Sequence, residues 1–373
     1  MQLPVLATET NTTATRSAIL AGLQFRLRNI EPRRIGIIKP SAVGDIAHAL
    51  PVATALRQRF PHAEISWVVN AGYASLLQQH PDLDDCILYD RQRIRCDWLD
   101  GLDYQARFLR NLRKRYFDLV IDLQGLFRSA LMVQASGARW KMGLASAREG
   151  ARWFYNLVLP DELWTMHAVD RYWLAAEALS CSTPLRFRFP PLDQERNRWL
   201  GRLAALPRPW VMMNLGTRWE TKRWPVKHFA ILGQHVYLTS GGRVIMVGGA
   251  DENELAGEFV RYWSRQVYST VGQTSLRDLV ALLSLADLVL SNDSGPLHLA
   301  AAMGKRVLAP FTCTSTTRTG PYGQMHHAIV TSVPCAASYL KTCNHRSCMQ
   351  ELTPERLLPT MDKLLHTWQR YSA

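Results

Sequence analysis

Short apolar runs alternate with stretches of helical periodicity along most of this chain. The apolar runs have the length and composition of buried strands, and they fall at residues 34–39, 64–69, 86–89, 119–123, 210–215, 243–247, 287–290 and 306–310. Helical patterns lie between them at residues 46–60, 73–79, 104–116, 226–238, 276–283 and 299–303. Strands that alternate with helices predict parallel sheets covered by helices on both faces, the α/β class.

The alternation of predicted strands and helices is interrupted once and then resumes, which predicts two domains. Residues 179–209 are irregular and rich in Pro and Arg, as interdomain connections often are. We expect an N-terminal extension at 1–32, a doubly wound domain at 33–190, and a second one with a C-terminal helix at 191–373. Two such Rossmann-like domains would face a central cleft lined by the carboxyl ends of their strands. The apolar, arginine-flanked end of the extension fits a helix touching a membrane, or a disordered or docked segment.

The segment from Ser291 to His298 carries the most specific chemistry. It follows an apolar strand and leads into a small-residue helix that is expected to end at Gly304, with Ser294 as N-cap and Pro296 in the first turn. The free N–H groups of such a helix start bind anions such as phosphate. Asp293 would repel phosphate, so we expect it to bind neighbouring hydroxyls. This combination favours a nucleotide-sugar site, where His298 either faces the phosphates or packs.

Three further loops follow predicted strands. In the first, residues 39–45, Gly44 permits a tight turn and Asp45 is either a helix N-cap or a general base. The second, residues 216–225, carries hydroxyls and cations suited to a diphosphate leaving group, among them Thr217 and Lys222. The third ends in Asp251 and Glu252, carboxylates that could bind ribose hydroxyls, although turns favour the same residues.

Composition narrows the partner and the class of reaction. The net charge of +13 favours an acidic partner (nucleic acid, anionic lipid or acidic glycolipid), although a solvated helix face is the other interpretation of its basic cluster. That cluster comprises Arg91, Arg93, Arg95, Arg107, Arg110, Arg113, Lys114 and Arg115.

A GxxxxGK[ST] loop, a GxGxxG fingerprint and an HExxH motif are all missing, which argues against kinases, ATPases, dinucleotide enzymes and zincins. We find neither a secretory signal nor an apolar run of about 20 residues.

Three cysteines gather near the C-terminus. Cys335, Cys343 and Cys348 surround His345 but lack paired C-x2-C spacing. We therefore favour reduced structural thiols over a metal knuckle, and expect no metal or other cofactor.

Six segments, taken in order, resemble the ADP-heptose:lipopolysaccharide heptosyltransferases of glycosyltransferase family 9. They are Lys39-Pro-Ser-Ala-Val-Gly-Asp45, Asp122-Leu-Gln-Gly-Leu-Phe-Arg-Ser129, Ser146-Ala-Arg-Glu149, Lys222-Arg-Trp-Pro225, Ser291-Asn-Asp-Ser-Gly-Pro-Leu-His298 and Thr319-Gly-Pro-Tyr-Gly323. The third segment and His167-Ala168-Val169-Asp170 are most similar to the enzymes that add the first heptose to Kdo. The resemblance implies a GT-B fold and inverting, metal-independent transfer from ADP-heptose, with the acceptor bound by the first domain and the donor by the second.

The resemblance also implies roles for individual residues. Asp45 would be the catalytic base, in a loop whose Ser41 and Gly44 meet the acceptor, and Arg128 and Arg148 would bind acidic groups of that acceptor. The expected donor residues are Thr217, Lys222, Asp251, Glu252, Asp293, Ser294, Gly295 and His298. The implied partners are a nucleotide sugar, the acidic inner core of lipopolysaccharide and the inner face of the cytoplasmic membrane, but no nucleic acid. We expect a cytoplasmic protein, peripheral at that membrane.

Other interpretations stay open at this point. Another family 9 enzyme could transfer a second heptose or a different sugar, or could modify a protein. A nucleotide-sugar epimerase with a similar fold would need no basic acceptor surface. A non-catalytic protein that binds nucleic acid or anionic membrane would explain the charge, but not the joint presence of Asp45, Lys222 and Asp293.

Overall fold

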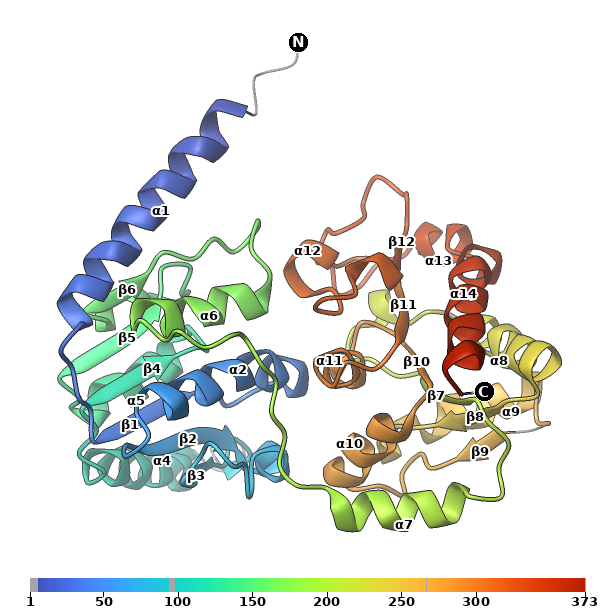
Figure 1. Cartoon of the computed structure of the whole chain (residues 1–373), viewed down its shortest axis with the longest axis horizontal. Coiled ribbons are helices and arrows are strands. Elements are labelled where there is room, and N and C mark those ends of the chain that lie inside the picture. Colours follow the sequence, from blue (N-terminus) through green and yellow to red (C-terminus); the bar gives the residue numbers. More distant parts are fainter. Residues whose placement is uncertain (1–5, 94–97, 266, 373) are drawn as a thin grey trace. The chain divides into compact units, whose positions relative to one another are not determined.

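The computed structural model describes residues 6–93, 98–265 and 267–372, so Arg95 lies outside the described residues. The chain divides into two compact units, residues 1–191 and 192–373 (Figure 1). Each unit is built around its own parallel sheet of six strands.

The sheet of the first unit has the strand order β3-β2-β1-β4-β5-β6. Its strands are β1 (Arg34–Ile38), β2 (Glu64–Asn70), β3 (Asp85–Tyr89), β4 (Leu119–Asp122), β5 (Trp140–Leu144) and β6 (Leu157–Leu159). The helices are α1 (Leu6–Leu27), α2 (Val43–Arg59), α4 (Trp98–Arg113), α5 (Phe127–Ser136) and α6 (Ala168–Ala178), with 3₁₀ turns η1 (Ala71–Leu76) and η2 (Ala151–Phe154). The chain therefore starts in the middle of the sheet, extends it to one edge, and returns to build the other.

The second unit repeats this plan with the order β12-β11-β10-β7-β8-β9. Its strands are β7 (Trp210–Asn214), β8 (Arg243–Met246), β9 (Val267–Ser269), β10 (Leu288–Ser291), β11 (Val307–Phe311) and β12 (Ala328–Val330). The helices are α7 (Asp193–Leu203), α8 (Val226–Ser240), α9 (Asn253–Tyr262), α10 (Leu276–Leu285), α11 (Gly295–Ala302), α12 (Thr316–Thr319), α13 (Ser347–Glu351) and α14 (Pro354–Ser372). Short 3₁₀ turns η3 (Glu220–Lys222), η4 (Ala250–Glu252) and η5 (Met325–His327) complete it.

Both sheets reverse their strand order at one place, between β1 and β4 in the first unit and between β7 and β10 in the second. Ile38 pairs with Asp122 at the first of these points, and Ser291 with Asn214 at the second. Loops that leave the carboxyl ends of two such strands diverge to opposite faces of the sheet, which opens a crevice for a ligand. The loops singled out from sequence after β1, β7 and β10 all begin at these points.

The central strands form because their residues are apolar on both faces. β4 and β7 are buried along their whole length, as expected for strands covered by helices on both sides. Local signals fix helix ends as predicted: Ser275 caps α10 in a capping box with Asp278, and the backbone turns at Gly304, where φ is +70°.

Some elements differ from the sequence prediction. The region expected to be irregular contains α7, whose Trp199 and Leu203 are buried although most of its surface is polar. The helix expected at 73–79 is the 3₁₀ turn η1. The strands β5, β6, β9 and β12 were not predicted, because the last three have only three residues each and Lys141 and Gly143 interrupt the apolar pattern of β5.

The N-terminal helix α1 is docked on the first unit. Leu23 and Leu27 are buried, and Gln24 Nε2 donates to the carbonyl of Glu177 in α6 at 2.9 Å. Among the described residues, no helix has both the length and the hydropathy needed to cross a bilayer.

Candidate active site

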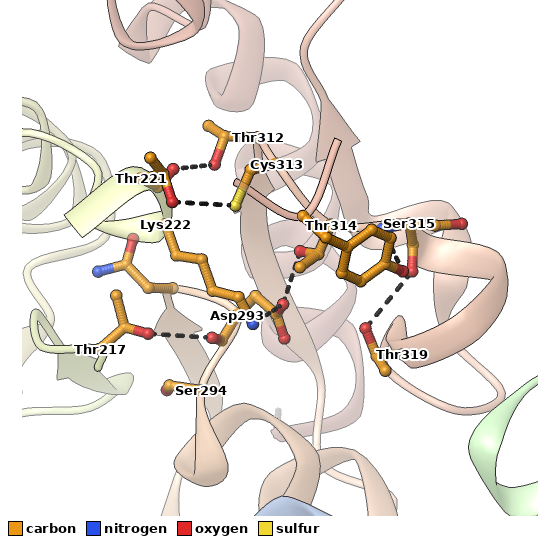
Figure 2. A network of polar contacts seen from close by, with 12 residues as sticks. Thr217, Thr221, Lys222, Asp293, Ser294, Thr312, Cys313, Thr314, Ser315 and Thr319 are labelled. Carbon is orange, nitrogen blue, oxygen red and sulfur yellow. Dashed lines mark hydrogen bonds and ion pairs between the residues drawn. The ribbon is translucent and has the colours of Figure 1, made fainter. Parts of the chain in front are cut away.

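Asp293 is the centre of a polar network in the second unit (Figure 2). It lies between the end of β10 and the start of α11, and it is only 3% exposed. Its Oδ2 atom accepts hydrogen bonds from Lys222 Nζ and Thr314 Oγ1, both at 2.6 Å. The Nε2 atom of His298 lies 3.1 Å from the other carboxylate oxygen. The buried carboxylate is therefore matched by donors on both of its oxygens.

These contacts keep Asp293 ionised. Burial by itself opposes the charge, but the Lys222 cation and the His298 ring outweigh it and hold the pKa of the Asp293 carboxyl far below its usual range. From the sequence, Asp293 was expected to repel phosphate and to bind neighbouring hydroxyls. The structure adds a contact that the sequence did not predict, because Lys222 brings a positive charge onto this carboxylate.

The loop after β7 places Lys222 by contacts along its length. Thr217 Oγ1 donates to the carbonyl of Asp293 at 3.3 Å, which connects this loop to the loop after β10. The ammonium of Lys222 lies 4.7 Å from the centre of the Trp219 ring. The preceding residue, Thr221, is buried and donates to the carbonyl of Leu340 at 2.6 Å. Lys222 therefore projects from a turn that is fixed on both sides.

Sequence reasoning missed three residues of this network, all in the loop after β11. Thr312 Oγ1 donates to the carbonyl of Thr221 at 2.6 Å, and the thiol of Cys313 donates to Thr221 Oγ1 at 3.3 Å (Figure 2). Thr314 completes the set through its bond to Asp293. A signal was present: these residues follow a strand that neighbours β10 in the sheet, so they emerge at the same edge.

The start of α11 has the predicted N-cap at Ser294, followed by Gly295. The hydroxyl of Ser294 makes no capping bond to the helix; it donates instead to Asn214 Oδ1 at 2.9 Å and lies 3.0 Å from Ser291 Oγ. One turn later, His298 points its ring at Asp293, whereas the sequence had left open whether it faces the phosphates or packs.

Glu252 lies on the other side of Asn214. Its Oε2 atom accepts from Asn214 Nδ2 at 2.9 Å and from the backbone N–H of Gly216 at 3.1 Å. Burial raises the pKa of Glu252 to about 7, even though both hydrogen bonds favour the charged form. The neighbouring Asp251 is exposed. Of the two carboxylates predicted here, Glu252 is the one joined to the rest of the network.

In the first unit, Asp45 is held at the start of α2. It occupies the third helical position rather than the N-cap, which is Ala42, and its Oδ2 atom accepts from the Ala42 N–H at 3.2 Å. The hydroxyl of Tyr172 donates to Oδ1 at 3.3 Å, and Lys39 Nζ lies 3.7 Å from the same oxygen. The Asp45 side chain is 43% exposed. Its contacts with Ala42, Tyr172 and Lys39 orient the carboxylate, and the rest of it is open to solvent.

Lys39 and Tyr172 were not identified as site residues from the sequence. Lys39 is 3% exposed, and its ammonium donates to the carbonyl of Leu123 at 3.0 Å and to the hydroxyl of Tyr172 at 2.8 Å. Burial works against its charge, but Asp45 and Tyr172 overcome that effect and raise the pKa of Lys39 above its ordinary value. A lysine at the end of an otherwise apolar strand is the signal that could have revealed this buried cation.

A small pocket of about 70 Å³ lies beside this loop. Ser41 and Arg128 both line it, together with Arg91 and Gln124. The structure thus brings together two of the predicted acceptor residues, one from the loop after β1 and one from the first turn of α5. Gly44 is buried in the first turn of α2, and Arg148 is an exposed residue on the neighbouring loop after β5.

The clustered cysteines are free thiols. Cys335 is exposed, and Cys343 and Cys348 are partly buried. In the ranges that the structure describes, no three His, Cys, Asp or Glu side chains are arranged to hold a metal ion.

Comparisons with known proteins agree on one family. The model for glycosyltransferase family 9 (heptosyltransferase) matches residues 105–348. Lipopolysaccharide heptosyltransferase 1 of Pseudomonas aeruginosa is 30% identical over 89% of this chain and 98% of its own. Lipopolysaccharide heptosyltransferase 2 of Escherichia coli is 23% identical over the same shares. The structure of the E. coli heptosyltransferase WaaC with ADP is 26% identical, with a TM-score of 0.70 over 89% of this chain and 99% of that one.

The likeness to solved heptosyltransferases confirms the predicted α/β class and GT-B fold. The family match covers well over half of the sequence, and it extends from α4 to α13. With its two doubly wound units and this degree of similarity, the chain belongs to glycosyltransferase family 9, the heptosyltransferases of lipopolysaccharide core synthesis.

Proposed function

We propose that this enzyme transfers heptose from ADP-heptose to the Kdo sugar of a Kdo-lipid A acceptor, with inversion and without a metal ion. The choice of the first heptose is supported by the relative that shares 30% identity, a heptosyltransferase 1, against 23% for a heptosyltransferase 2. A neighbouring structure described with ADP-2-deoxy-2-fluoro heptose supports the choice of donor.

The observation that carries the proposal is the Lys222–Asp293 pair at the strand-order reversal of the second sheet. As the bond between the sugar carbon and the phosphate oxygen breaks, negative charge develops on the leaving ADP. The Lys222 ammonium and the N–H groups at the start of α11 (Ser294, Gly295) stabilise that charge, and Thr217 and His298 border the same loop. This is the role that a divalent cation has in many other transferases.

Asp293 has a second function in this scheme. A carboxylate offers about four lone-pair sites for hydrogen bonds, and Lys222, Thr314 and His298 use three. The remaining site accepts a hydroxyl of the heptose. Asp293 therefore positions both the sugar and the ammonium of Lys222. On the other side of Asn214, which donates to Glu252, we assign Glu252 and the exposed Asp251 to the ribose hydroxyls.

Asp45 is the proposed general base. The acceptor hydroxyl attacks the sugar carbon on the face opposite ADP; its proton passes to Asp45, the new oxygen–carbon bond forms, and ADP departs with the electrons of the bond that breaks. Tyr172 and Lys39 fix the direction of the Asp45 carboxylate from the protein side. Ser41, Gly44, Arg128 and Arg148 provide the acceptor side, where the arginines pair with acidic groups. An acceptor of this kind implies a site of action at the cytoplasmic face of the inner membrane.

A screen of donors against acceptors tests the proposal. ADP-heptose and Kdo-lipid A should give a product one heptose heavier by mass spectrometry, and UDP- or GDP-sugars should not. Transfer only to an acceptor that already carries one heptose would assign the second-heptose reaction instead. If no acceptor is glycosylated while ADP-heptose still binds, the chain is not the transferase proposed here.

A further inference from the structure

The segments that follow β4 and β5 in the first unit expose aromatic side chains. Phe127, the first residue of α5, is 46% exposed. Trp153, in the turn η2 after β5, is 88% exposed, the highest value among the exposed large hydrophobic residues that the structure describes. Trp153 and Phe127 together present a large exposed aromatic area, and such grouped apolar area, more than a single exposed residue, marks a surface that meets an apolar partner.

The two loops are joined into one surface. The backbone N–H of Arg148 donates to the carbonyl of Gly125 at 2.8 Å, and the N–H of Phe127 donates to the Glu149 carboxylate at 3.2 Å. The rings of Phe127 and Phe154 pack edge to face, with centroids 5.9 Å apart. Trp153 is therefore presented by a braced turn, not by a loose loop.

The segment that carries Trp153 also carries two basic residues. Arg148 and Arg152 are exposed, and within the described part of the chain neither forms an ion pair. The nearby carboxylate of Glu149 is directed at the Phe127 backbone. We call Phe127, Arg148, Arg152 and Trp153 the aromatic–basic edge.

We propose that the aromatic–basic edge docks on the surface of an anionic lipid bilayer. The inference rests on the proposed function: a glycolipid acceptor keeps its acyl chains in the membrane while its acidic sugar enters the pocket lined by Ser41 and Arg128. The rim of that pocket must then lie against the lipid headgroups. Tryptophan rings partition to the bilayer interface, and arginines are drawn to anionic headgroups.

The opposite edge of the same sheet offers a comparison. Tyr116, which precedes β4, is 71% exposed and also has basic neighbours. Arg115, however, is already paired there with Asp85 at 2.7 Å. That edge has an exposed ring and exposed cations far from the carboxyl ends of the strands, so it serves as a matched control.

Vesicle binding by the full chain tests the surface directly. The chain should co-sediment with vesicles of phosphatidylethanolamine and phosphatidylglycerol, less so as salt rises, and poorly with phosphatidylcholine alone. Arg152→Gln should weaken partitioning about fivefold, and Trp153→Ser should weaken it by a similar factor. Tyr116→Ser and Lys114→Gln should bind like the unmodified chain. Equal binding by all four variants would overturn the assignment.

A spectroscopic readout identifies the residue that enters the interface. Vesicles with bromine-labelled acyl chains should quench tryptophan fluorescence, and Trp153→Phe should remove most of that quenching while the chain still sediments with vesicles. Undiminished quenching in Trp153→Phe would show that another tryptophan meets the bilayer and would contradict the proposal.

Activity separates this inference from the proposed function. With a deacylated, water-soluble Kdo acceptor, Trp153→Ser and Arg152→Gln should transfer heptose at the normal rate, whereas transfer to the intact glycolipid in vesicles should fall. A chain that binds vesicles through Trp153 but transfers no heptose would refute the function and leave the surface standing. If the chain transfers heptose but neither substitution changes vesicle binding, the proposed function stands and the aromatic–basic edge is refuted as the docking surface.

Discussion

The ammonium of Lys222 lies 2.6 Å from the Asp293 carboxylate, and this ion pair connects the loops after β7 and β10. Neither side chain is freely mobile, since the Asp293 side chain is 3% exposed and that of Lys222 is 17% exposed. The pair is therefore part of the fold as well as part of the proposed donor site. Its two members should respond differently to substitution.

Lys222→Gln should lower kcat/KM for the donor by about a hundredfold, because the developing charge on ADP loses its nearest cation. Calorimetric titration with ADP should show weaker binding. The exposed Lys227, on α8 in the same unit, provides the control: Lys227→Gln should leave both quantities unchanged. Unaltered donor kinetics in Lys222→Gln would remove this residue from the site.

Asp293→Asn should lower the free energy of unfolding by about 3 kcal/mol, because it leaves the Lys222 ammonium without its buried partner. Urea unfolding measures this loss. The pKa of Asp293 is depressed in the folded state, so its stabilising effect is complete above the unfolded pKa near 4 and disappears as the pH falls toward the folded value. The difference in stability between the two chains should thus be constant from pH 5 to 8 and shrink below pH 4. If the difference in unfolding free energy between the two chains disappeared near neutral pH, a group other than Asp293 would be responsible for it.

Asp45→Asn should abolish heptose transfer while ADP binding stays normal, since Asp45 lies in the first unit and the proposed donor residues lie in the second.

Tyr172→Phe removes the hydroxyl that donates to Asp45 and should lower kcat more than it raises KM, with a shifted pH–rate profile. A purely structural role for Tyr172 would lower the melting temperature and leave the shape of the pH profile unchanged.

Much of this arrangement could be predicted from sequence because it depends on local signals. The strands β1, β4, β7 and β10 are continuous apolar runs, and the loops that follow them carry the polar residues. Within each sheet, parallel topology then requires these loops to share an edge. That argument singles out the loops that carry Asp45, Lys222 and Asp293, whereas the role of Asp45 as a base came from the family resemblance.

The rest depends on packing between segments far apart in the chain. The contacts of Lys39 with Tyr172 and of Thr314 with Asp293 span 133 and 21 residues, and no local pattern encodes them. The same holds for Ser294, whose position at a helix start predicts a capping bond. Tertiary contact with Asn214 turns its hydroxyl elsewhere.

Glu252 should make the stability of the chain fall as the pH rises from about 4.5 to about 7. Burial raises its folded pKa to about 7, so the folded chain binds more protons than the unfolded chain in this window. The stabilisation is complete below the unfolded pKa and is lost as the pH passes the folded one, by up to about 3 kcal/mol. Glu252→Gln should flatten this part of the stability curve in urea titrations. Equal slopes for both chains would contradict the raised pKa.

Cys343 should react with iodoacetamide at pH 7.5 before Cys86 and Cys181 do. The backbone N–H groups of Arg346 and His345 stabilise its thiolate and lower the pKa of the thiol. In contrast, burial raises the pKa of Cys86 to about 11 and of Cys181 to about 12. Because the thiolate is the reactive form, Cys343 should be modified more than about ten times faster than these two.

Mass spectrometry of peptides after brief labelling measures the order of reaction, with Cys343→Ser as the control for the assignment of the modified peptide. The same experiment tests the metal alternative for the cysteine cluster. If Cys335, Cys343 and Cys348 are plain thiols, prior treatment with a chelator leaves the labelling order unchanged. If they bind a metal, the purified chain resists labelling at all three until the chelator removes the ion, so the order of labelling differs before and after chelation.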